Sequence, residues 1–177
     1  MRRRLEITPG FCILWALLLL MLPLRLILAA GAAALLHECC HALVIRLTGG
    51  AVTGITIGAG GTVMETTPMK SGQELVCALA GPLGSFLLVL LYQIFPLLAL
   101  CALVQGCFNL LPLYPLDGGR ALACLLPSKC MKAIEIVTLL ALLALAVGLR
   151  MGIGPVLAWG MLAMRKIPCK DHRFGVE

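Results

Sequence analysis

The sequence predicts an all-α polytopic membrane protein with about six transmembrane helices and a small β-hairpin at the membrane surface. Of its 177 residues, 61% are hydrophobic and only 12% are charged, whereas soluble domains are about half apolar and a quarter charged. The apolar residues form successive runs, and Lys and Arg gather in small groups between them. Such groups are how membrane proteins fix their orientation. At this length we expect one membrane-embedded domain, residues 1–177, with no appended soluble domain.

Composition also argues against a nucleic-acid-binding protein and against a disulfide-bonded secreted scaffold. The net charge is +6, but the basic residues form no stripe interleaved with aromatics, so we expect no nucleic-acid partner. Nine cysteines are present and none forms a CxxC pair. Most lie in apolar stretches, where a free cysteine behaves as a small hydrophobe. The lipid bilayer is therefore the expected partner, and the cysteines receive no chemical role.

The first element is predicted as two membrane-spanning helices, residues 11–24 and 26–47, that form a hairpin. A basic start, a Leu-rich core and small residues would also suit a cleaved signal peptide. Cleavage would leave His37 almost at a new N-terminus, which disfavours that interpretation. The first run is short against the ~20 residues that a span needs. A single long helix from residue 11 onward would reverse the orientation of everything that follows.

The next segment differs in composition from the apolar runs, because residues 51–65 are rich in Thr, Val, Ile and Gly. Ile55 and Ile57 flank Thr56, and the glycines that follow supply a turn, so we predict a short β-hairpin. Four further spans are expected after it: residues 75–92 with a break at Gly81-Pro82, 94–111, 133–149 and 153–164.

The distribution of positive charge supports six alternating spans. With the N-terminus in the cytosol, twelve of the fourteen Lys and Arg residues fall on the cytosolic side, and only Arg25 and Arg150 fall outside. This asymmetry is the one that the positive-inside rule expects. The sequence therefore predicts a multi-pass protein of the cell membrane with both termini in the cytosol.

The most informative residues are His37-Glu38-Cys39-Cys40-His41. Positions i and i+4 of a helix share one face, so both imidazoles can reach one zinc ion at about 2.0–2.1 Å. Glu38 lies beside them, where it can act as the general base that takes a proton from water. Packed polar residues are the alternative, but ionisable groups within a membrane helix are rare and usually functional. We therefore predict a metal site with a catalytic carboxylate.

A catalytic zinc site normally takes three protein ligands, and the best donor for the third is Asp117. It lies in the segment 109–119, whose two prolines cannot continue a regular helix. We expect Gly118 and Gly119 to relax the backbone just after the carboxylate. Irregular backbone at membrane depth is tolerated where it lines a wet cavity. The alternative is an ordinary loop whose aspartate pairs with Arg120.

These two motifs resemble those of the site-2 protease family of intramembrane metalloproteases. The family pairs HExxH on one helix with an LDG aspartate on a later one, which here is Leu116-Asp117-Gly118. Further landmarks, Gly60-Gly61-Thr62-Val63, Leu79-Ala80-Gly81-Pro82-Leu83 and Asn109 through Gly119, are similar to those of the small bacterial sporulation protease of the stage IV FB type. The resemblance runs from about residue 11 to residue 165.

The resemblance implies one zinc ion per chain, bound by His37, His41 and Asp117, with Glu38 as general base and acid. It also implies a catalytic core of about residues 26–120, an active-site opening toward the cytosol, and a role for Asn109 in ordering substrate or water. In relatives the glycine-rich hairpin presents a strand edge to an unwound substrate, which strand addition makes physically reasonable. A membrane-associated protein substrate, such as a sporulation pro-transcription factor, and a regulatory membrane partner are the partners so implied; the oligomeric state is undetermined.

The sequence thus predicts a zinc endopeptidase that hydrolyses peptide bonds of membrane-tethered or membrane-docked substrates. The alternative is a membrane metal-binding or transport protein, or a proteolytically inactive homologue. These alternatives would use the same ligands but would not need Glu38 as a base. Internal repeats, which are common in transporters, are not evident.

Overall fold

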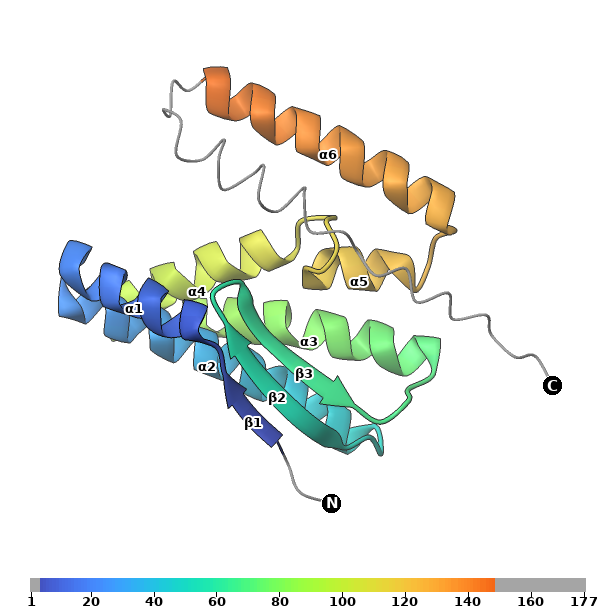
Figure 1. The fold of residues 1–177 in the computed structure, drawn as a ribbon, viewed down its shortest axis with the longest axis horizontal. Coiled ribbons are helices and arrows are strands. Elements are labelled where there is room, and N and C mark those ends of the chain that lie inside the picture. The colour runs from blue at the N-terminus through green and yellow to red at the C-terminus, as the bar shows by residue number, and fades with distance from the viewer. Residues whose placement is uncertain (1–3, 149–177) are drawn as a thin grey trace.

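The computed structural model describes residues 4–148 as a mostly helical protein with a small sheet (Figure 1). The elements in order are β1 (Arg4–Ile7), α1 (Pro9–Met21), α2 (Leu24–Leu47), β2 (Val52–Gly58), β3 (Gly61–Thr66), α3 (Ser71–Val89), α4 (Pro96–Asn109), α5 (Asp117–Ala123) and α6 (Ser128–Gly148). The prediction of a mostly helical protein with a β-hairpin is confirmed, whereas the predicted number of spans stays a prediction. The predicted span at 153–164 lies outside the described residues.

The first apolar stretch forms two separate helices, as the sequence predicts. Helix α1 is only 13 residues long and ends at Met21, and α2 begins at Leu24 after Pro23, which adopts an extended conformation as its N-cap. Proline favours this arrangement because its missing N–H cannot join a continuing helix. At the start of α1, the Thr8 side chain accepts a hydrogen bond from the Phe11 N–H at 3.4 Å.

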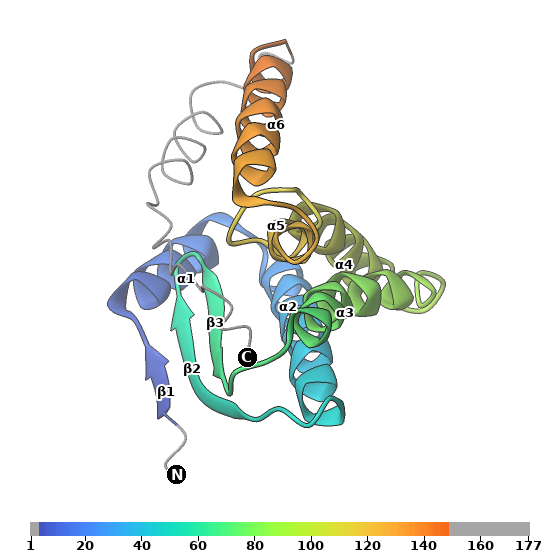
Figure 2. The ribbon, with the colours of Figure 1, turned by 90° about the vertical axis from the view of Figure 1, so that its right-hand side faces the viewer.

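The predicted hairpin is present as the antiparallel pair β2–β3, and the sheet has a third strand that the sequence analysis missed. Strand β1 pairs in parallel with β2, with Arg4 opposite Gly54 and Ile7 opposite Ile57. The strand order is β1-β2-β3. Figure 2 shows the sheet standing on one side of the helices α2, α3 and α4.

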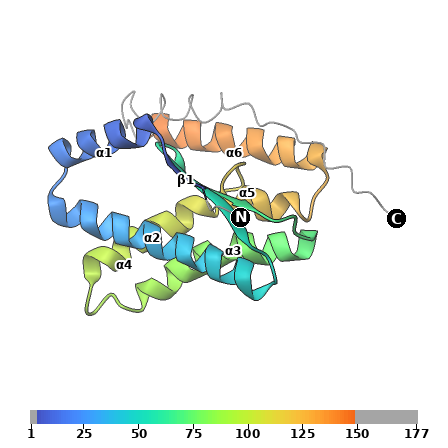
Figure 3. The same cartoon turned by 60° about the horizontal axis from the view of Figure 1, so that its bottom comes forward.

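Helices α2, α3 and α4 pack against one another, and α5 packs against α3. Figure 3 shows that α1 and α6 lie outside the group formed by these three helices. The buried residues of α2 include Ala33, His37, His41 and Ile45, which recur every four positions on one face. Small residues dominate the buried faces of the other two helices, which lets the backbones approach closely. They are Cys77, Ala78, Gly81 and Ser85 in α3, and Ala99, Ala102 and Gly106 in α4.

The outer surface is strongly apolar. In the described part of the chain, far more large apolar side chains are exposed than buried, and they lie on all of the longer helices. Helices α2 and α3 are each long and apolar enough to cross a membrane, while α1 and α4 are apolar but shorter. Lipid, rather than water, is the solvent that such a surface suits.

Two local predictions were wrong. Helix α3 begins at Ser71 and continues through Gly81 and Pro82, so there is no break there. The segment after α4 is irregular only until Leu116, because the short helix α5 begins at Asp117. The two glycines that were expected to relax the backbone are therefore helical.

The contact between α2 and α3 depends on Gly84, because a methyl group added there would collide with the Cys40 Sγ and lie 3.0 Å from the Cys40 Cβ. We expect Gly84→Ala to lower the free energy of unfolding by about 1–3 kcal/mol through overpacking. Thermal unfolding of the purified protein in detergent measures the loss. Adding Cys40→Ala should restore much of it, because the colliding sulfur is removed.

Gly72 on the same helix provides the matched control. A methyl group added there meets nothing within 4 Å, so Gly72→Ala should not lower the melting temperature. Equal melting temperatures for Gly84→Ala and Gly72→Ala would contradict the packing assigned to Gly84.

Candidate metal centre

Side chains from two distant parts of the sequence, two histidines of α2 and the aspartate that begins α5, converge between the helices. The Nε2 atoms of His37 and His41 lie 3.0 and 3.1 Å from Oδ2 of Asp117 and 3.2 Å from each other. The three residues are buried, with exposed fractions of 2%, 6% and 6% in the order His37, His41, Asp117. The structure therefore brings together the three metal ligands that the sequence predicts.

Each ligand is placed by the local structure of its helix. His37 and His41 are four residues apart on the buried face of α2, one turn from each other. Asp117 is the first residue of α5, where a carboxylate is stabilised by the positive end of the helix dipole. The irregular segment before α5 turns the chain, so that a helix begins where the aspartate meets the two imidazoles.

Helix α3 provides a hydrogen-bond partner for the Nδ1 atom of each imidazole. His41 Nδ1 donates a hydrogen bond to the carbonyl oxygen of Cys77 at 2.7 Å, and His37 Nδ1 lies 2.8 Å from the hydroxyl oxygen of Ser85. Because a carbonyl only accepts, His41 carries its proton on Nδ1 and its Nε2 lone pair is free. The hydroxyl of Ser85 can accept in the same way from His37. In the neutral tautomer with the proton on Nδ1, each ring has its Nε2 lone pair available for a metal ion, as in metal-ligating histidines.

The spacing of the three atoms suits a small divalent cation. Ligands about 2.0–2.1 Å from a tetrahedral zinc ion lie about 3.3–3.4 Å from one another. The observed separations of 3.0–3.2 Å are close to this value. Two neutral nitrogens and one carboxylate oxygen leave a fourth position for water, as catalytic zinc sites do. His37, His41 and Asp117 could therefore hold a metal ion.

Gly81 keeps the space at the histidines open. A methyl group added there would collide with His41 Nε2 and lie 2.6 Å from His37 Nε2. Any larger residue at this position of α3 would therefore occupy the place where the two ligand nitrogens converge.

The two glycines after Asp117 have a packing role rather than the predicted conformational one. A methyl group on Gly118 would collide with the carbonyl oxygen of Leu110, and one on Gly119 would lie 2.5 Å from the carbonyl oxygen of Leu113. Helix α5 therefore lies directly on the irregular backbone that precedes it. Only glycine permits that approach, because it lacks a Cβ.

The other two predicted site residues, Glu38 and Asn109, are not among the three clustered side chains. Glu38 is half-buried on α2 next to His37 and lies within electrostatic reach of both histidines and Asp117. The amide of Asn109 donates to the carbonyl oxygen of Gln105 at 3.2 Å, at the end of α4. This hydrogen bond is directed along α4 rather than toward the cluster.

The alternative pairing of Asp117 with Arg120 is present alongside the cluster. Arg120 Nη1 lies 3.8 Å from Oδ1 of Asp117, while its Nη2 lies 3.9 Å from Glu74 on α3. The two carboxylate oxygens of Asp117 are therefore divided, with Oδ2 facing the imidazoles and Oδ1 facing the guanidinium. One aspartate takes part in both interactions.

Sequence reasoning missed the residues of α3 that support the histidines. Cys77, Gly81 and Ser85 are spaced four residues apart, so they lie on one helical face. A row of small residues on a predicted membrane helix is the signal that would have indicated a close contact with the histidine helix.

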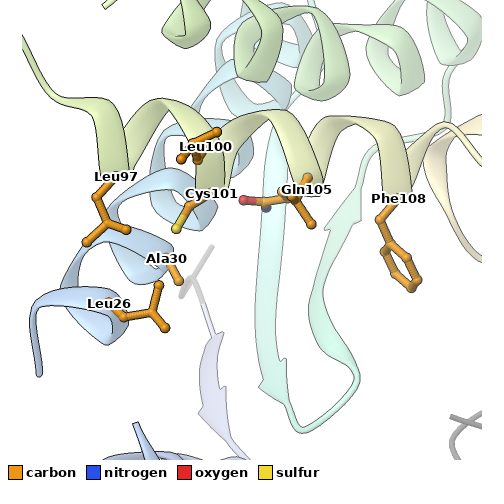
Figure 4. Close-up of a pocket in the computed structure, with 8 residues that line it drawn as sticks. Leu26, Ala30, Leu97, Leu100, Cys101, Gln105 and Phe108 are labelled. Atoms are coloured by element: carbon orange, nitrogen blue, oxygen red, sulfur yellow. The ribbon is translucent and has the colours of Figure 1, made fainter. Parts of the chain in front are cut away.

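A concave feature lies away from the cluster, between the beginning of α2 and helix α4. It is an apolar groove of about 490 Å³, lined by Leu26, Ala30, Leu97, Leu100, Cys101, Val104, Gln105 and Phe108 (Figure 4). None of these residues belongs to the cluster. Its lining suits hydrocarbon, so we assign it no chemistry.

Loss of the Ser85 hydroxyl should weaken metal binding. We expect Ser85→Ala to raise the zinc dissociation constant by about 10–100-fold, because His37 then loses the partner of its Nδ1. Competition with a chromophoric chelator measures the constant. Ser71→Ala is the matched control on the same helix, since the Ser71 hydroxyl donates instead to the carbonyl oxygen of Cys124. Similar dissociation constants for the two variants would contradict the role of Ser85.

Comparisons with known proteins agree with this geometry. No family model matches the chain. The chain is 33% identical over 132 residues to a zinc metalloprotease of Methanocaldococcus jannaschii, in an alignment that covers 66% of this chain but 36% of that protein. The chain thus spans about a third of the length of this curated relative.

A solved structure is similar over a much larger share of both proteins. The site-2 protease from Methanocaldococcus jannaschii matches with a TM-score of 0.66 and 25% sequence identity, over 89% of this chain and 86% of that one. The fold, the sequence identity and the converging ligand set point to the same family, whose members are integral membrane proteins. The sequence identity and the shared fold together support the site-2 protease family for this chain.

Proposed function

We propose that this protein is an intramembrane zinc endopeptidase that cuts membrane-tethered or membrane-docked protein substrates. The observation that carries the proposal is the convergence of His37, His41 and Asp117 to within 3.0–3.2 Å, with Glu38 on the same helix turn. A relative with 33% identity is a zinc metalloprotease, which supports zinc as the ion and proteolysis as the activity. We infer that one ion binds per chain.

The ligands are Nε2 of each histidine and Oδ2 of Asp117. A zinc ion held there supplies a Lewis acid that polarises a peptide carbonyl and acidifies water. The hydrogen bonds to Ser85 and Cys77 keep both imidazoles in the orientation and tautomer that this requires. Arg120, 3.8 Å from Oδ1, holds the second carboxylate oxygen of Asp117 away from the ligand position.

Glu38 is the proposed general base and acid. Its carboxylate takes a proton from water as the water oxygen attacks the scissile carbonyl, and later returns the proton to the leaving amine. Its half-buried position next to His37 is consistent with access to both the cluster and an incoming peptide. A transporter would not need this residue, which makes it the best point of discrimination.

We infer that the substrate binds as an extended strand. Strand β3 pairs with β2 along one edge, and the sheet order leaves its other edge without a partner strand in the described part of the chain. Strand addition at such an edge gives an unwound peptide its backbone hydrogen bonds. We further propose that Asn109 orders substrate or water, and that a sporulation pro-transcription factor is one candidate substrate, as the family resemblance suggests.

We propose that six spans place both termini and the opening of the active site on the cytosolic side. Twelve of fourteen Lys and Arg residues support this orientation. His37 precedes Arg46 by nine residues, or roughly 14 Å of helix. The metal site would then lie within the bilayer but close to cytosolic water.

Replacing the proposed base should abolish cleavage without loss of the metal. We expect Glu38→Gln to lower the cleavage rate by about 10²–10⁴-fold, because the amide cannot accept the proton, and to leave one zinc bound. Co-expression with tagged pro-transcription factors and single-span substrates measures cleavage, and metal analysis of the purified protein measures zinc. Glu6→Gln, at an exposed carboxylate of β1, is the matched control.

Each other outcome of this experiment identifies a specific error. Cleavage by both wild type and Glu38→Gln would show that Glu38 is not the base. If neither protein cuts any substrate, and both bind one zinc that is lost on His37→Ala, the metal-binding alternative replaces the protease. A chelator should stop cleavage by the wild type, and added zinc should restore it.

The proposed orientation predicts which loops are accessible from outside the cell. With the exposed native cysteines replaced by serine, Ala51→Cys should react with an impermeant maleimide only after the cells are permeabilised. Tyr92→Cys, in the connection between α3 and α4, should react in intact cells. The reverse pattern would place the hairpin and the metal site at the outer face.

A further inference from the structure

The irregular segment before Asp117 leaves one backbone N–H for another part of the chain to bind. Of the seven residues 110–116, two are prolines and carry no N–H. Four of the other five donate to backbone carbonyls within the segment or the end of α4, namely Leu110, Leu111, Leu113 and Leu116. The remaining donor is the N–H of Tyr114. At membrane depth an unpaired backbone group is costly, so its partner matters.

The partner of this N–H is a carboxylate on a different helix. Glu135, in the first half of α6, accepts a hydrogen bond from Tyr114 N at 3.0 Å through Oε1. The sequence analysis gave Glu135 no role. This carboxylate accepts from the one N–H of residues 110–116 that no backbone carbonyl binds.

The same backbone nitrogen lies against the helix that carries the metal ligand. A methyl group added at Gly119 would lie 2.6 Å from Tyr114 N, so α5 rests on one side of this peptide while Glu135 binds it. Asp117 is two residues before Gly119, at the beginning of α5. A shift of the Tyr114 peptide would therefore move the carboxylate that faces His37 and His41.

Helix α6 has few other attachments to the described chain. It packs mainly against α5 and lies apart from α2, α3 and α4 (Figure 1). Within the described residues, the hydrogen bond from Tyr114 is the only one between an α6 side chain and the segment around Asp117. The position of α6 and the position of the ligand segment are thus linked through this hydrogen bond and through the packing of α6 against α5.

We propose that Glu135 is a positioning residue, which fixes the 110–116 segment by accepting the Tyr114 N–H and thereby holds Asp117 in place to bind the metal. The role depends on the acceptor oxygen and its reach from α6, and not on the negative charge. The inference rests on the proposed metal site, because it assigns Glu135 an effect on metal affinity.

Three substitutions at one position separate these properties. Glu135→Gln keeps an acceptor oxygen at the same reach but removes the charge, so its zinc dissociation constant should stay within about twofold of wild type. Glu135→Asp keeps the charge but shortens the side chain, and Glu135→Ala removes the acceptor. Both variants should bind zinc about tenfold more weakly, because losing a group that orients a metal ligand lowers the affinity for the metal. Thr138→Ala, one turn along α6, is the matched control.

Zinc affinity is measured by chelator competition on the full chain in detergent, and Co²⁺ substitution reports ligand geometry through its visible absorption spectrum. We expect the Co²⁺ spectrum to change in Glu135→Asp and to remain that of wild type in Glu135→Gln. Should Glu135→Ala fail to fold, the comparison of Gln with Asp still decides. The proposal is overturned if Gln weakens zinc binding as much as Asp does, or if Asp and Ala both bind as wild type. A wild-type protein that binds no zinc would instead refute the proposed function.

Discussion

The two hydrogen bonds from the imidazoles of α2 to α3 are the interactions on which the rest of the site depends. They fix the ring orientation of His37 and His41 through Cys77 and Ser85, and they turn both Nε2 atoms toward Asp117. In a low-dielectric interior, unsatisfied ring nitrogens would be costly. The preference for paired polar groups therefore aligns the ligands before any ion binds, and an ion then meets a site that needs little rearrangement.

Close packing makes those hydrogen bonds possible. Gly81 and Gly84 let α3 approach α2 at the histidines and at Cys40, while Gly118 and Gly119 let α5 rest on the backbone before it. Between membrane helices there is no hydrophobic driving force, so contact area and polar bonds provide the attraction. The glycines near the metal cluster thus serve both stability and chemistry, since the contact that holds the helices also sets the ligand distances.

The parts of the site that follow local rules could be predicted from the sequence. The i, i+4 spacing of His37 and His41 is a property of one helix, and the motif around Asp117 supplied the third ligand. Ser85, Cys77 and Glu135 could not be placed in this way, because their roles depend on which helix faces which. Strand β1 was missed for a similar reason, since its residues pair with residues 50 positions later in the chain, as Arg4 does with Gly54. Helix α5 was missed because two adjacent glycines normally disfavour a helix.

The parallel pairing of β1 with β2 also has a consequence for the path of the chain through lipid. Strand β1 precedes α1 and strand β2 follows α2, so both strands must lie on the same side of the bilayer. The two helices between them therefore make an even number of crossings: either both traverse the membrane or neither does. If α2 crosses the membrane, α1 must cross it as well. Its 13 residues make a helix about 20 Å long, whereas the hydrocarbon core is about 30 Å thick. A helix this short would be accommodated by a locally thinner bilayer, by snorkelling of its flanking residues or by association with other helices.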